Sequence, residues 1–80
     1  MKNFEGNIVK FWEYRTARVI DNVIFKSDLD EKGLINVMNY VEEQGYHFDN
    51  HIVFQMDNGL YVWVHDNRII VGKSIEIGDW

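Results

Sequence analysis

The chain has 80 residues, a formal net charge of −5 and no cysteine. A chain of this length folds as one domain with a modest core, so we expect residues 1–80 to form a single unit. The lack of cysteine excludes disulfides and thiolate chemistry and fits a reducing cytosol. No apolar run approaches the roughly 18 residues of a membrane span, and the N-terminal segment lacks the apolar core of a signal peptide. We therefore expect a soluble, cytoplasmic protein.

Charge is unevenly distributed along the chain. Residues 1–26 carry a net charge of +2, residues 27–66 carry −7, and residues 67–80 are neutral overall. An acidic domain is a poor candidate for direct nucleic-acid binding, which needs Lys and Arg to neutralise phosphates. The acidic region instead favours a partner protein with a basic surface, although the same charges also promote solubility. The chain has no proline and one alanine but much Asn and Ile, which is typical of AT-rich bacterial and phage genomes.

Two segments near the N-terminus are predicted to be strands. Residues 8–14 and 17–26 contain neither Gly nor Pro, and the second segment is dense in β-branched side chains. We expect the two to form a hairpin, because that pairing places opposite charges face to face. The pairs are Glu13 with Arg18 and Lys10 with Asp21. An amphipathic helix over the same residues is the alternative.

A helix is predicted after these strands. Ser27 or Asp28 can cap its first turn, and Gly45 is suited to end it. Apolar residues recur at helical spacing on one face, which predicts the side that packs on the sheet: Leu34, Val37, Met38 and Val41. Glu42 and Glu43 fall in the last turn, where the helix dipole disfavours each acidic group by about 0.3–1 kcal/mol.

Residues 52–72 are predicted to form a three-stranded antiparallel meander. Residues 57–59 and 66–67 supply turn chemistry between three β-rich segments. A three-residue loop at 57–59 separates the faces cleanly, whereas a slip of one residue would mix them. One face is then aliphatic: Ile52, Phe54, Met56, Leu60, Val62, Val64, Ile69 and Val71. The other face carries Val53, Tyr61, Trp63 and Ile70 beside Gln55, His65 and Arg68.

These elements predict an α+β fold in which a single helix packs on an antiparallel sheet, with the sequence order ββαβββ. The helix can cover only one face of the sheet. If the N-terminal hairpin folds across Tyr61 and Trp63, these side chains belong to the core. If it does not, they form an exposed apolar patch of the kind found at interaction surfaces.

The sequence carries no catalytic or cofactor motif. Its Ser and Thr hydroxyls lie outside the context of an activated nucleophile. His47, Asp49 and His51 would share one side of an extended segment, and two His with one carboxylate form a known metal-ligand set. Their spacing is loose and lacks a rigid support. We therefore expect no bound metal, no cofactor and no enzymatic activity.

The expected function is noncatalytic protein binding. The size and acidity of the chain suit a small inhibitor of another macromolecule, of the phage anti-defence or immunity-protein type. The residues expected to contact the partner combine the aromatic face with acidic groups: Trp63, Tyr61, Ile70, Glu42, Glu43 and Asp57.

Two alternatives remain open at this point. One is a homodimeric structural or regulatory module that pairs through the face of Tyr61 and Trp63. The other is a small metal-binding or nucleic-acid-binding protein that uses His47, His51 and His65.

Overall fold

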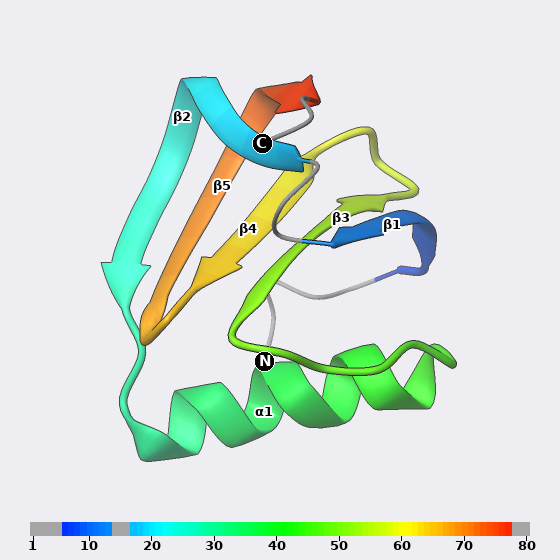
Figure 1. Ribbon diagram of the computed structural model, residues 1–80, viewed down its shortest axis with the longest axis vertical. Coiled ribbons are helices and arrows are strands. Elements are labelled where there is room, and N and C mark those ends of the chain that lie inside the picture. The colour runs from blue at the N-terminus through cyan, green and yellow to red at the C-terminus, as the bar shows by residue number, and fades with distance from the viewer. Residues whose placement is uncertain (1–5, 14–16, 78–80) are drawn as a thin grey trace.

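The computed structural model describes residues 6–13 and 17–77 and shows five strands and one helix in the predicted order ββαβββ (Figure 1). The elements are β1 (Ile8–Glu13), β2 (Ala17–Asp28), α1 (Glu31–Glu43), β3 (His51–Met56), β4 (Tyr61–His65) and β5 (Arg68–Ile77). The strands form one antiparallel sheet in the spatial order β1-β3-β4-β5-β2. The predicted α+β class is confirmed. No helix in the described ranges is long and apolar enough to span a membrane.

The meander of β3, β4 and β5 has the predicted register. Phe54 lies opposite Val62, as a three-residue first loop requires. Gly59 closes that loop in the left-handed region at φ 91°, where glycine has no steric penalty. The second loop is a two-residue turn in which Asp66 adopts φ 55°. Asp tolerates this conformation better than most residues other than glycine.

The predicted N-terminal hairpin is wrong, although β1 and β2 are both strands. β1 pairs with β3 and β2 pairs with β5, so they lie on opposite edges of the sheet. The observed pairs are Lys10 with Gln55, Glu13 with Ile52, Arg18 with Glu76 and Asp21 with Ser74. The physical reason is that the meander has two open edges, and one strand on each satisfies the backbone groups of both.

The short connection between β1 and β2 forces the sheet to curl. Glu13 lies in the row of the sheet that contains Ile69, whereas Ala17 pairs with Ile77, eight residues further along β5. In a flat sheet these two strand ends would be about 33 Å apart. Four peptide steps span at most about 14 Å, so the ribbon of β2 and β5 must bend back over the sheet.

The bend is directed away from α1. β2 comes close to β3 and β4, which are not its hydrogen-bonded neighbours. Since α1 occupies one face of the sheet, the ribbon can approach these strands only across the other face. Two register shifts within β2 supply the local bending and twist.

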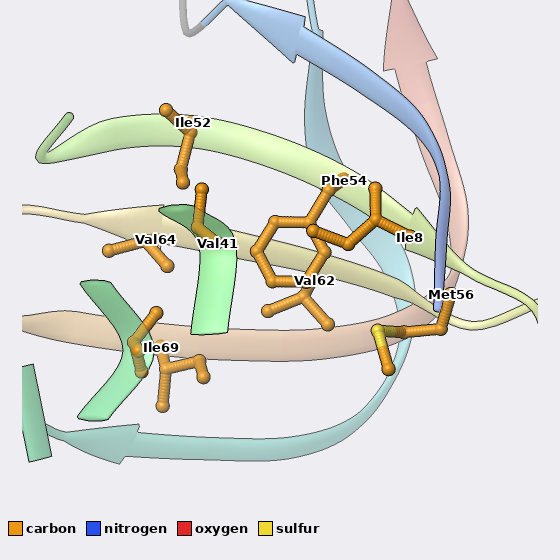
Figure 2. Close-up of a cluster of buried hydrophobic side chains, with 9 residues drawn as sticks. Ile8, Val41, Ile52, Phe54, Met56, Val62, Val64 and Ile69 are labelled. Carbon is orange, nitrogen blue, oxygen red and sulfur yellow. The ribbon is translucent and has the colours of Figure 1, made fainter. Parts of the chain in front are cut away.

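α1 covers the aliphatic face and closes the main core (Figure 2). Val37 and Val41 of the helix are fully buried. The rest of the buried cluster comes from the sheet: Ile8, Ile52, Phe54, Met56, Val62, Val64 and Ile69. Leu34, which we expected in this cluster, is only half-buried. It lies in the first turn, at the end of the apolar stripe that Val37 and Val41 centre.

α1 begins later than predicted. β2 continues to Asp28, and Ser27 Oγ donates a hydrogen bond to the Asp28 carbonyl, so neither residue caps the helix. Asp30 is the cap, because its Oδ1 accepts a 2.7 Å hydrogen bond from Gly33 N. Two more residues of β2 therefore extend the ladder with β5 beyond the predicted strand.

α1 ends as predicted. Gly45 adopts φ 92°, and the following Tyr46 N donates a 3.2 Å hydrogen bond back to Val41 O. This cap directs Tyr46 toward the core, where its ring stacks on Phe11 at a centroid distance of 4.7 Å. The end of the helix is thereby tied to β1.

Replacing Phe54 by Ala should destabilise the fold severely. Phe54 is fully buried, and deleting a buried ring costs about 3–5 kcal/mol, a large part of the stability of a small domain. The matched control is Phe25→Ala, because Phe25 is 41% exposed and should cost less than about 1 kcal/mol. Urea denaturation measures both, and equal costs would contradict the assignment of the core face.

Candidate functional site

The face of the sheet turned away from α1 carries aromatic side chains, and we call it the aromatic face. Residues opposite each other in neighbouring strands share a face, so the strand register defines its rows. One row runs across all five strands through Trp12, Val53, Trp63, Ile70 and Lys26. The next row contains Lys10, Gln55, Tyr61, Gly72 and Val23. Three of the predicted partner residues are therefore neighbours: Tyr61, Trp63 and Ile70.

The aromatic face is neither ordinary core nor an open patch. Val53 at its centre is fully buried, whereas Tyr61, Trp63 and Ile70 are half-buried. The cover comes from the curled ribbon and from β1, and not from an N-terminal hairpin. The face is most open at its β2 edge, where Val23 is 47% exposed.

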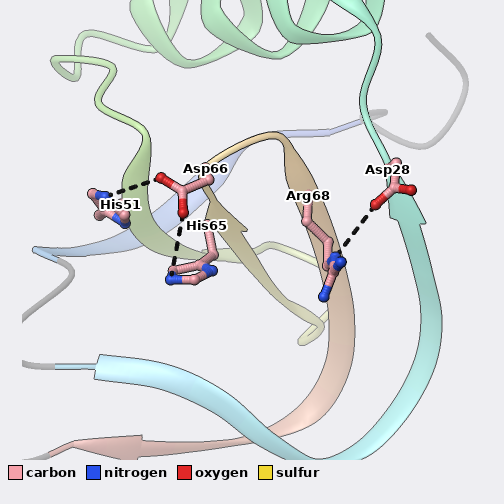
Figure 3. A network of polar contacts seen from close by, with 5 residues as sticks. All are labelled: Asp28, His51, His65, Asp66 and Arg68. Carbon is pink, nitrogen blue, oxygen red and sulfur yellow. Dashed lines mark hydrogen bonds and ion pairs between the residues drawn. The ribbon is translucent and has the colours of Figure 1, made fainter.

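A polar row borders the aromatic face at the β4–β5 turn (Figure 3). His51 lies opposite His65, which lies opposite Arg68. Asp66 contacts both imidazoles: His51 Nε2 is 3.4 Å from one carboxylate oxygen and His65 Nε2 is 4.0 Å from the other. Arg68 Nε pairs with Asp28 Oδ1 at 3.3 Å. Such solvent-exposed pairs contribute about 0–1 kcal/mol each, so they orient the turn more than they stabilise the fold.

The predicted metal-ligand cluster is not assembled. His47 and Asp49 are exposed in the connection after α1, and Asp49 Oδ1 accepts a hydrogen bond from Asn50 N. His51 faces His65 instead, across the strand pair. In the part of the chain that the structure describes, no three His, Asp or Glu side chains are placed to hold one metal ion.

A hollow of about 340 Å³ lies beside the polar row, lined by Asp28, Leu29, His65, Asp66, Asn67 and Arg68. Its charged groups are engaged with one another, Arg68 with Asp28 and Asp66 with His65. The neighbouring Ser27 hydroxyl donates to the Asp28 carbonyl. The hollow therefore offers hydrogen-bonding groups rather than an activated nucleophile.

The predicted acidic partner residues lie on a different surface. Glu42 and Glu43 are exposed in the last turn of α1. α1 packs on the opposite face of the sheet from Tyr61, Trp63 and Ile70 (Figure 1). The structure therefore does not join the acidic and aromatic candidates into one patch.

Asp57, the last predicted partner residue, supports the fold. Its Oδ2 accepts a 3.1 Å hydrogen bond from Asn7 N, and its own N donates to Asn7 O at 2.9 Å. Beside it, Tyr40 Oη donates a 2.8 Å hydrogen bond to Gly6 O. These bonds hold the start of β1 against the first loop of the meander and α1. Burial, and secondly the charge of Asp57, raise the pKa of Tyr40.

The expectations from sequence miss three residues of the aromatic face: Trp12, Lys10 and Lys26. Trp12 packs on Tyr61 with ring centroids 5.9 Å apart. The alternation of β1 was a usable signal, since it places Trp12 and Lys10 on one side of the strand. Their neighbours Val53 and Gln55 could not be foreseen, because no local feature shows that β1 joins β3.

Comparison with known proteins adds no indication of function. No family model, no curated protein and no solved structure matches the chain. The function is therefore argued from the site alone.

Tyr40→Phe should change how stability depends on alkaline pH. The folded-state pKa of Tyr40 is raised above its ordinary value of 10.0. The neutral phenol therefore stabilises the fold below that value, and this contribution is lost as the pH rises through the folded-state pKa. The free energy of unfolding, measured from about pH 8 to about pH 11, should fall less steeply for Tyr40→Phe than for the wild type. Tyr46→Phe is the matched control and should keep the wild-type slope.

Purified protein is expected to contain no stoichiometric zinc or iron, because the ligand spacing of residues 47–51 is loose. Elemental analysis after dialysis measures the content. One metal ion per chain that is lost in His51→Ala but kept in Ile35→Ala would contradict this expectation.

Proposed function

We propose that this chain is a noncatalytic protein-binding domain that acts as a small inhibitor of another macromolecule. The observation that carries the proposal is the half-buried group of Tyr61, Trp63 and Ile70 on the aromatic face. Large aromatic side chains that stay partly accessible are the usual anchors of protein interfaces. The exposed Val23 at the open edge extends this apolar surface.

The polar groups beside the aromatic face support binding over catalysis. His51 and His65 both approach the carboxylate of Asp66, and Arg68 is paired with Asp28. A general base or nucleophile needs a partner group aimed at a substrate site. Here the described contacts tie these side chains to one another around a turn.

The inhibitor class is supported by size and charge. Residues 27–66 carry a net charge of −7, and Glu42 and Glu43 are exposed on α1. Such a negative field speeds encounter with a basic partner. A small acidic domain of this kind suits the phage anti-defence or immunity-protein type.

Isolation of the partner from the native host, followed by binding kinetics with the purified pair, tests the proposal. Trp63→Ala should mainly speed dissociation and weaken binding by about 2 kcal/mol or more if Trp63 is an anchor. Because Trp63 is half-buried, the fold of this variant must be checked by circular dichroism.

Val23→Ser gives a second test that avoids the core, because Val23 is 47% exposed. It should also speed dissociation. The matched control is Ile35→Ser on α1, where Ile35 is 44% exposed on the far side of the sheet. A partner that responds to Ile35→Ser but to neither aromatic-face variant would refute the assignment of the binding surface.

Reversing Glu42 and Glu43 to Lys tests the role of the acidic surface. The double variant should slow association and flatten its salt dependence while leaving dissociation unchanged. Unchanged association would remove the acidic surface from the proposal. A concentration-dependent dimer that Val23→Ser dissociates would favour the homodimeric alternative.

A further inference from the structure

We propose that the aromatic face binds an acidic segment of a partner protein, in which apolar side chains contact Tyr61 and Ile70 and carboxylates contact Lys10 and Lys26. The inference rests on the proposed function and adds the chemistry of the partner at that surface. It assigns the contact itself to acidic groups of the partner, opposite in sign to the basic surface that the net charge of the chain alone favours.

Two lysines stand at opposite edges of the aromatic face. Lys10 of β1 shares a row with Tyr61, and Lys26 of β2 shares a row with Trp63 and Ile70. Both lysines are exposed, and neither forms an ion pair with the other residues that the structure describes. An apolar segment seated between them would meet a cation at each end of its path.

The other charges of the aromatic face are balanced in pairs. Arg68 contacts Asp28 at 3.3 Å. Glu76, which alternation along β5 places on this face, lies opposite Arg18. Lys10 and Lys26 therefore give this face an excess of positive charge on a chain whose net charge is −5.

The acidic groups that dominate the net charge lie elsewhere. Glu31, Glu42 and Glu43 belong to α1 and are exposed on the other side of the sheet. Asp57 is held at the first loop of the meander by Asn7. A partner that touches the aromatic face meets the lysines first, so the charge of that partner surface should be negative.

The same distribution favours a protein segment over a nucleic acid as the occupant. Nucleic acid presents a regular series of phosphates and needs a cation for each one that it neutralises. Two unpaired lysines serve a segment with two carboxylates, whereas the remaining acidic groups of the domain would repel a longer polyanion.

The test uses defined probes and tryptophan fluorescence: a copolymer of glutamate and tyrosine, a copolymer of lysine and tyrosine, and oligothymidylate. The glutamate–tyrosine copolymer should bind more tightly than the other two. The double variant Lys10→Glu/Lys26→Glu should weaken that binding by about two- to thirty-fold, as expected from the loss of two exposed ion pairs. The matched control is Lys32→Glu, which changes an exposed lysine of α1 and should leave the binding unchanged.

Three outcomes would overturn the inference. They are tighter binding of the lysine–tyrosine copolymer or of oligothymidylate, equal weakening by Lys32→Glu and the double variant, and no binding of the glutamate–tyrosine copolymer at all. If any of these occurs while Val23→Ser still speeds dissociation of the native partner, the proposed function stands and only the partner chemistry is wrong. If the native partner ignores Val23→Ser and Trp63→Ala, the proposed function itself fails.

Discussion

The architecture depends on one geometric constraint, namely that only three residues separate β1 from β2 although these strands occupy opposite edges of the sheet. A flat sheet cannot satisfy it, because the chain from Glu13 to Ala17 is less than half as long as the gap it would have to bridge. The ribbon of β2 and β5 therefore bends across the face away from α1. This bend places Val53 in a buried centre and leaves Val23 exposed at the open edge.

The two faces of the sheet consequently differ in physical character. The aliphatic face meets α1 and buries Phe54, Val41 and Ile69 completely, so its side chains supply most of the hydrophobic stabilisation. The aromatic face is covered by a polar-rich ribbon and keeps Trp63 and Tyr61 partly accessible. Charge follows the same division, with exposed acidic groups on α1 and unpaired lysines beside the aromatic side chains. The sheet thus separates a stabilising surface from a candidate contact surface.

Local chemistry was sufficient wherever an element is defined by near neighbours. The loop that ends at Gly59 and the turn at Asp66 set the register of the meander, because a slip of one residue would expose its aliphatic face. Gly45 ended α1 for the same kind of reason. The helix start was misplaced by two residues, since Ser27, Asp28 and Asp30 can all cap and only the pairing of β2 with β5 decides among them.

Long-range pairing was beyond local chemistry. The sequence by itself determined the α+β class, the three strands of the meander, the helix and the grouping of Tyr61, Trp63 and Ile70, because periodicity and turn residues encode these directly. Only the tertiary structure decided that β1 and β2 take opposite edges, that Trp12 packs on Tyr61, and that the acidic residues of α1 face away from both. Two open edges compete for the same two strands, and the choice is made by closing the whole sheet rather than by any residue within the strands.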